Sequence, residues 1–202
     1  MTVALIILAY LMGSIPVGVL VGRTRGFDPR TVGSGNVGMT NVARSGGASA
    51  AAITFVGDIL KGFIPVIVGQ WMHLDAAALA MVGFAAVLGA VFSIFLRFEG
   101  GRGVSTSLGV WLALALIPIL IVLAVFAAVL AARRIISLAS IVAAVALPIV
   151  VALMGCPGEY IGLAAAIAAL VILRHRENIG RLIRGQEPTF KMGGRAVGER
   201  AQ

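Results

Sequence analysis

The stretch VSTSLGVWLALALIPILIVLAVFAAVLAA, residues 104–132, decides how many times this chain crosses a membrane. Its 29 residues carry no charge, so it forms either one long helix or a hairpin of two short helices that turn near Pro118. Proline lacks the backbone N–H that a helix interior uses, and its ring collides with the preceding turn. One long helix gives six spans in total, and a hairpin gives seven.

The composition of the whole chain is that of an integral membrane protein. The 202 residues are 60% hydrophobic and 12% charged, with a mean hydropathy of +1.06, which excludes an ordinary soluble domain. The first apolar run, residues 2–22, would rise about 31 Å as a helix, and a bilayer core is about 30 Å thick. It lacks the basic flank and cleavage motif of a signal peptide, so we interpret it as a span. The other apolar segments are residues 50–72, 76–96, 135–154 and 160–173.

The positions of the basic residues favour the hairpin. With a turn near Pro118, fifteen of the sixteen Lys and Arg residues lie on one side of the membrane, and Lys61 inside the second span is the exception. Basic loops are retained on the cytoplasmic side. We therefore predict an all-α integral membrane protein with seven transmembrane helices, some of them short, with the N-terminus outside and the C-terminus cytoplasmic. A single transmembrane domain is expected over residues 1–192, followed by a polar, disordered tail at 193–202.

This topology brings four polar segments to the cytoplasmic face. They are GSGNVGMTN at 33–41, FEGGRGVST at 98–106, RRIISLAS at 133–140 and RHRENIGRLIRGQE at 174–187. The net charge of +8 reflects topology and contact with anionic lipids, and nucleic acid is not implied. No internal repeat is evident, which weakens the case for an alternating-access transporter.

Two of these segments are rich in glycine and in hydrogen-bond donors. GSGNVG matches the dinucleotide fingerprint, but that motif requires a preceding strand, and an apolar helix precedes it here. Its glycines, Gly35 among them, allow consecutive backbone N–H groups to form an anion-binding nest. Side-chain donors for such a nest are Ser34, Asn36, Thr40, Asn41 and Arg44. The second loop offers Gly101, Arg102 and Gly103 in the same way, at the start of a helix. The alternatives are a flexible connector and a turn with a cytoplasmic arginine.

Two pairs of polar residues lie three positions apart on helices. Asp58 and Lys61 share one face of the second span, where ionisable groups either pair or face a polar cavity. His175 and Asn178 lie at the end of the last span, where a histidine is either functional or merely interfacial. We expect His73 to be interfacial and the lone Cys156 to be structural. No cluster has metal-ligand spacing, so neither a metal nor a cofactor is expected.

The motifs resemble one family. GSIPVG at 13–18, GSGNVGMTN, DILKG at 58–62, GGRGVST at 100–106 and the H-x-x-N-I-G-R-L-I-R-G-Q-E run at 175–187 are similar to those of the bacterial membrane-integral acyl-phosphate:glycerol-3-phosphate acyltransferases. The resemblance implies transfer of a fatty acyl group from acyl phosphate to the 1-hydroxyl of glycerol 3-phosphate, giving lysophosphatidic acid and phosphate. Together with the topology, it leads us to expect a protein of the bacterial cytoplasmic (inner) membrane with its active-site loops in the cytoplasm and membrane lipids around it. We also expect a monomer.

The resemblance assigns roles to named positions. Lys61, Arg102 and His175 are the implied catalytic residues, with Asp58 holding Lys61. The phosphate contacts that the resemblance implies are Ser34, Asn36, Arg44, Ser137, Ser140 and Asn178. The nest interpretation adds the predicted phosphate and glycerol contacts Gly35, Thr40, Asn41, Gly101 and Gly103. The chain departs from the family pattern at Ala90, where a histidine is usual, and at Glu99 and Arg102, where lysines are usual. A phosphate or organic-anion transporter and a non-catalytic lipid-binding protein remain the alternatives.

Overall fold

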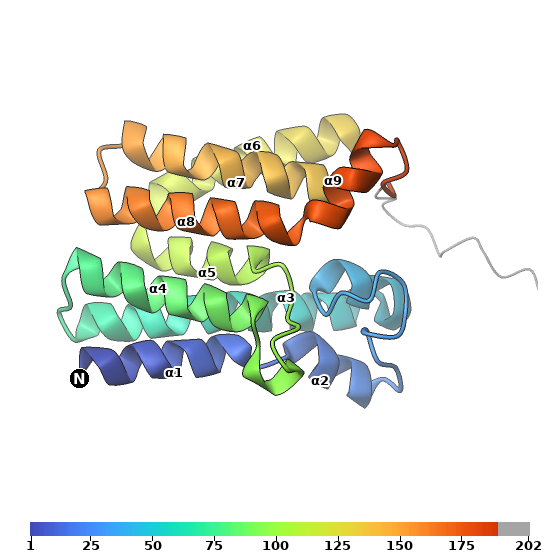
Figure 1. The fold of residues 1–202 in the computed structure, drawn as a ribbon, viewed down its shortest axis with the longest axis horizontal. Coiled ribbons are helices and arrows are strands. Elements are labelled where there is room, and N and C mark those ends of the chain that lie inside the picture. The colour runs from blue at the N-terminus through green and yellow to red at the C-terminus, as the bar shows by residue number, and fades with distance from the viewer. Residues whose placement is uncertain (190–202) are drawn as a thin grey trace, which may run out of the picture.

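The computed structural model describes residues 1–189, and this part of the chain is all-helical, with no strand (Figure 1). The predicted tail at 193–202 lies outside the described residues. The helices lie side by side as a bundle, and helices adjacent in the bundle are often distant in the sequence: α1 packs on α4, α3 on α5 and α4 on α8 (Figure 1). The elements are α1 (Thr2–Ser14), α2 (Val17–Thr24), α3 (Met39–Trp71), α4 (Ala76–Val91), the 3-10 helix η1 (Ile94–Leu96), α5 (Val104–Leu114), α6 (Leu116–Arg133), α7 (Ile136–Leu153), α8 (Gly158–Arg174) and α9 (Arg176–Ile183).

The long apolar stretch is broken into two helices, as the hairpin interpretation predicts. The break falls at Ala115, with φ −154° and ψ 86°, and Pro118 lies in the first turn of α6. First-turn N–H groups have no partner within a helix, so a proline is tolerated there and the chain turns before it. In Figure 1, α5 runs away from the end that holds α9, and α6 runs back toward it.

Five helical stretches within residues 1–189 are long and apolar enough to cross a membrane. They are Thr2–Thr24 taken across Pro16, α3, Ala76–Leu96 taken across Phe92, α6 and α7. The α8 helix qualifies only together with α9, from which it is bent by 61°, and α5 has only 11 residues. The prediction of an all-α integral membrane protein is confirmed, with five or six candidate spans.

Two helices differ from the predicted segments. The second span is part of the longer helix α3, which begins at Met39, so the end of the GSGNVGMTN segment is helical. Gly47 interrupts α3 with φ 75° and ψ −175°, which separates a short first part from the apolar part. The first span is broken after Ser14, because Pro16 cannot donate a helical hydrogen bond.

Close helix contacts depend on glycines. Gly13 of α1 meets the Ala86 carbonyl of α4, and Gly109 of α5 meets the Ile59 carbonyl of α3. Membrane helices associate through such close backbone approach, because lipid provides no hydrophobic force between them. The short helix α5 is also fixed at its end, where the Gln70 side chain donates to the Ala113 carbonyl at 2.9 Å. This bond satisfies one of the carbonyls that the last turn of α5 leaves without a helical partner.

The α3–α5 contact gives a stability prediction. We expect Gly109→Ala to destabilise the protein by about 1–3 kcal/mol, because the added Cβ would overlap the Ile59 carbonyl and lie 3.0 Å from Phe63 N. The matched control is Gly162→Ala in α8, where a Cβ would meet no atom within 4 Å. Thermal unfolding in detergent measures both. Equal shifts in the two variants would mean that close packing at Gly109 is unimportant.

Candidate active site

The predicted polar segments meet at one end of the bundle. In Figure 1 the loop before α3, the loop between α4 and α5, and α9 all lie at this end. Contacts join them: a methyl group on Gly101 would lie 3.8 Å from Asn36 Oδ1, and Arg174 Nη2 donates to the Gly100 carbonyl at 2.9 Å. The fourth segment joins them through Ser137, whose hydroxyl donates to Glu187 at 2.7 Å, so four segments distant in the sequence border one region.

The first glycine-rich loop is held in shape by Asn41. The buried Asn41 side chain accepts from the Ser34 N–H at 2.9 Å and donates to the carbonyls of Pro29 at 2.8 Å and Val32 at 3.0 Å. Asn36 Oδ1 accepts from the Gly38 N–H at 2.8 Å. Asn41 therefore supports the loop from beneath, and the side chains of Ser34 and Arg44, which are both exposed, are left at its surface. Gly35 has φ 68°, a left-handed conformation that favours glycine, and its N–H donates to the Val32 carbonyl at 3.0 Å. The N–H groups of Ser34 and Gly35 are therefore already bonded within the loop, which corrects the predicted backbone anion nest. Thr40 is half-buried in the first turn of α3.

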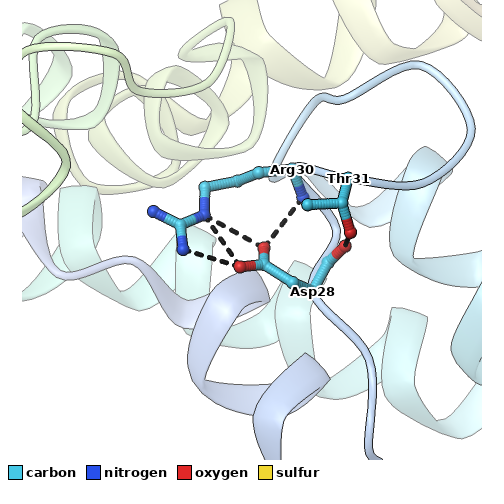
Figure 2. A network of polar contacts seen from close by, with 3 residues as sticks. All are labelled: Asp28, Arg30 and Thr31. Atoms are coloured by element: carbon cyan, nitrogen blue, oxygen red, sulfur yellow. Dashed lines mark hydrogen bonds and ion pairs between the residues drawn. The ribbon is translucent and has the colours of Figure 1, made fainter.

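A compact network that the sequence did not predict braces the start of this loop (Figure 2). The Asp28 carboxylate accepts from the Arg30 backbone N–H at 2.9 Å and from Arg30 Nη2 at 2.6 Å, and the Thr31 hydroxyl donates to the Asp28 carbonyl at 3.1 Å. The hydrogen bond from the Arg30 side chain lowers the pKa of Asp28 to about 2. The carboxylate thus stays charged at any physiological pH.

The second glycine-rich loop differs from the predicted nest. The N–H groups of Gly100 and Gly101 donate to the carbonyls of Val91 at 3.0 Å and Ala90 at 2.9 Å, at the end of α4, so neither is free to bind an anion. Gly103, with φ 76°, is the N-cap residue that precedes α5. The contact at position 90 uses the backbone carbonyl, and the Ala90 side chain takes no part in it.

Arg102 lies in this loop as a half-buried cation. Among residues 1–189 its guanidinium has no ion-pair or hydrogen-bond partner. Burial lowers its pKa, the negative charge of nearby Glu187 raises it, and the nearby Arg181 lowers it. Arginine stays protonated despite such shifts, so Arg102 presents an uncompensated charge to the region between the loops.

Glu187 is a site residue that the sequence did not single out. Its carboxylate accepts from the Ser137 hydroxyl at 2.7 Å, from the Asn178 amide and from Arg181 Nε at 2.6 Å. Burial raises the pKa of Glu187, but the bonds from Ser137, Asn178 and Arg181 outweigh burial and the net pKa is lowered. Ser137 and Asn178, both predicted to contact phosphate, are therefore hydrogen-bonded to the Glu187 carboxylate. The only sequence signal for Glu187 was its position as the last residue of the run at 175–187 that resembles the family.

His175 is buried at the bend after α8. Its Nδ1 lies 2.7 Å from the Val171 carbonyl, so Nδ1 carries the proton and the neutral ring keeps a lone pair on Nε2. Burial, reinforced by the positive charge of Arg102, lowers the pKa of His175 to about 4 although the Val171 bond raises it. The imidazole is therefore neutral at pH 7, as a proton acceptor requires.

This pKa predicts how acid affects the protein. Unfolded chains protonate histidine near pH 6.5 and the folded protein resists protonation to about pH 4, so stability falls as pH decreases through this window. At pH 5 we expect a loss of about 2 kcal/mol relative to neutral pH. Thermal unfolding at pH 7 and 5 measures it, and His175→Gln should lose less over the same range. NMR in a His73→Gln background can follow His175 alone. A titration of His175 between pH 6 and 7 would contradict its lowered pKa.

Lys61 is buried and has two partners. Its ammonium lies 2.9 Å from Asp58 Oδ1 and donates to the Ile15 carbonyl at 3.0 Å, at the break between α1 and α2. Asp58 holds Lys61, as the spacing suggests. The next residue, Gly62, packs on Thr106 at the start of α5, so Lys61 lies at the level of the second loop.

The remaining features of the site are the position of Ser140 and the distribution of possible metal ligands. Ser140 is buried one turn beyond Ser137 on α7. No group of three or more His, Cys, Asp or Glu residues that could hold a metal ion is found in the described residues.

Comparison with known proteins identifies the family. The family model described as "Glycerol-3-phosphate acyltransferase" matches residues 3–185. A glycerol-3-phosphate acyltransferase of Geotalea daltonii is 48% identical over 189 residues, 94% of this chain and 97% of its own. One of Rubrobacter xylanophilus is 44% identical over 196 residues, covering 97% and 98% of the two chains.

Solved structures agree with the sequence relatives. The crystal structure of the integral membrane glycerol 3-phosphate acyltransferase PlsY in its glycerol 3-phosphate form superposes with a TM-score of 0.90, at 41% identity over 94% of this chain and 96% of the other. The lysophosphatidic acid form of PlsY superposes with a TM-score of 0.88, at 40% identity over 94% of this chain and 95% of the other. The chain belongs to the glycerol-3-phosphate acyltransferase family and has the fold of its integral membrane members.

Proposed function

We propose that this protein transfers a fatty acyl group from acyl phosphate to the 1-hydroxyl of glycerol 3-phosphate, forming lysophosphatidic acid and inorganic phosphate. Similarity over nearly the whole chain to proteins named for this acylation supports the proposal. The observation that carries it in the structure is Arg102, a half-buried cation without a partner in residues 1–189, which lies near Glu187 and His175. A half-buried cation without an ion-pair partner is suited to bind a phosphate group.

The proposed reaction needs no covalent acyl-enzyme. The 1-hydroxyl oxygen attacks the carbonyl carbon of the acyl phosphate, the bond from that carbon to the phosphate oxygen breaks, and phosphate leaves with the electron pair. The protein positions two anions and stabilises the charge that develops on the carbonyl oxygen and the leaving phosphate. The hydroxyl proton passes to His175 Nε2 or to a phosphate oxygen of the substrate.

We also propose seven spans, with the N-terminus outside and the site facing the cytoplasm of a bacterial inner membrane. The break at Ala115 and the return of α6 toward the end that holds α9 support this topology (Figure 1). A cysteine placed at the exposed Ile117, in a Cys156→Ser background, should react with an impermeant thiol reagent only from outside. Labelling only from the cytoplasmic side would overturn the hairpin topology. We propose that the protein acts as a monomer among membrane lipids.

Assay of the purified protein tests the activity. Palmitoyl phosphate and glycerol 3-phosphate should give phosphate and lysophosphatidic acid in equal amounts, and omission of glycerol 3-phosphate should abolish both. Palmitoyl-CoA is the control donor and should give no product. Phosphate uptake into proteoliposomes without acylation would instead indicate a transporter, for which the comparisons offer no support.

A further inference from the structure

A hollow lies between α2 and the 3-10 helix η1, apart from the residues assigned to catalysis. It has a volume of about 370 Å³ and adjoins a second hollow of about 430 Å³, with which it shares Arg30, Phe95 and Leu96. Sites that bind a small ligand measure about 300–1,000 Å³. Figure 1 shows α2 and the loop that carries η1 next to each other at the edge of the bundle.

The first hollow combines an apolar wall with a basic rim. The wall is formed by residues of α2 and the preceding break, with two from η1: Ile15, Pro16, Val19, Leu20, Phe95 and Leu96. Leu20 and Phe95 are 48% and 60% exposed, so the wall is open to surrounding lipid. Arg23 and Arg30 form the rim, and Arg97 and Glu99 line the adjoining hollow.

The rim has positive charge available for a ligand. Neither Arg23 nor Arg97 has an ion-pair or hydrogen-bond partner among residues 1–189. Arg30 is paired with Asp28, and Figure 2 shows that one terminal nitrogen of its guanidinium is turned away from the carboxylate. Positive charge therefore remains in excess even after Asp28 and Glu99 are counted.

The hollow borders the candidate active site at two points. Ile15, on its wall, is the residue whose carbonyl accepts the hydrogen bond of Lys61 Nζ at 3.0 Å. Glu99, in the adjoining hollow, directly precedes the glycine-rich loop of Arg102. A ligand that enters from lipid through this hollow would thus arrive beside the catalytic residues.

We propose that the hollow between α2 and η1 is the entry site for the acyl-phosphate donor, with the acyl chain on the apolar wall and the phosphate at Arg23 and Arg97. The proposal rests on the proposed function. A phosphate with a single ester or anhydride link carries close to two negative charges, whereas the phosphodiester of a membrane phospholipid carries one, so the excess positive charge of the rim favours the former. The size of the hollow also favours one acyl chain over two.

Kinetics with palmitoyl phosphate tests the proposal. Arg23→Gln and Arg97→Gln should each lower kcat/KM for palmitoyl phosphate by about fivefold, the effect of one basic residue that faces an anionic amphiphile, while KM for glycerol 3-phosphate stays unchanged. Leu20→Trp, which narrows the hollow, should lower the same kcat/KM. The matched control is Arg25→Gln, since Arg25 caps α2 but donates to the Ser49 hydroxyl on another side. Unchanged kcat/KM in all three variants, or a rise in KM for glycerol 3-phosphate, would overturn the proposal.

Direct binding separates this proposal from the proposed function. Hexadecyl phosphate has the chain and the phosphate of the donor but no acyl group to transfer, so its binding does not require the enzyme to be active. Its affinity for the detergent-solubilised protein should fall in the Arg23→Gln, Arg97→Gln double variant and should persist in excess phosphatidylglycerol. Equal competition by phosphatidylglycerol would identify a phospholipid headgroup site and overturn the donor assignment. Binding that is unaffected by the double variant would overturn the site itself.

Discussion

Arg102→Ala is expected to lower kcat for phosphate release by about 100- to 1,000-fold, the effect of removing one preorganised donor from a developing negative charge. Arg102 is half-buried beside Glu187 and has no partner within the described residues, so no neighbouring group compensates for its loss. The measurement is steady-state phosphate release from palmitoyl phosphate and glycerol 3-phosphate by the purified variant.

Two further variants define what Arg102 contributes. Arg102→Lys keeps the charge but replaces a planar, forked donor with a point charge, and should retain far more activity than alanine if charge is what matters. Arg134→Ala removes an exposed arginine in the turn between α6 and α7 and should have little effect. Near-normal turnover of Arg102→Ala would refute a role in the chemistry.

Lys61→Met is expected to abolish most activity and to destabilise the protein. The substitution leaves the Asp58 carboxylate buried without the partner that now lies 2.9 Å away. Removing one member of a buried pair typically costs about 3–5 kcal/mol. Turnover and thermal unfolding in detergent should therefore both decline.

The double variant Asp58→Asn, Lys61→Met separates the two effects. It leaves no buried charge at the pair, so thermal stability should recover toward that of the wild type. We expect activity to remain at least 100-fold below wild type, because the ammonium is still missing. Recovery of both stability and activity would show that Lys61 only neutralises Asp58 and fixes the Ile15 carbonyl.

Much of the fold could be predicted from the sequence because lipid imposes simple rules on it. Long uncharged runs marked the spans, and Pro118 with the placement of arginines indicated the break before α6. The early start of α3 at Met39 could not be predicted, because glycines and polar residues around Gly47 obscure a helix that tertiary contacts stabilise. The 3-10 helix η1 could not be predicted either, because it forms the end of the apolar segment 76–96 and the composition of that segment does not indicate that α4 stops at Val91.

The candidate site was predicted in part. Composition pointed to the glycine-rich segments, spacing pointed to Asn178, and the family resemblance pointed to Ser137, but none of these could show which donors already have partners. Gly101 uses its N–H to hold α4, and Asn41 holds its own loop. Glu187 was missed because its importance arises from contacts with α7 and α9, which are 50 and 9 residues distant in the chain.

The helix α5 is shorter than its neighbours α4 and α8. Its 11 residues rise about 16 Å, and its last turn is tied through Ala113 to Gln70 at the far end of α3. The loop of Arg102 also adjoins the ends of α4 and α8, whose 16 and 17 residues rise about 24 and 26 Å, so it lies somewhat less than the thickness of a hydrocarbon core, about 30 Å, from the opposite end of the bundle. For the reaction proposed above, an acyl chain could then reach this loop while most of the chain stays in the hydrocarbon, and the water-soluble substrate would approach from the loop side of the bundle.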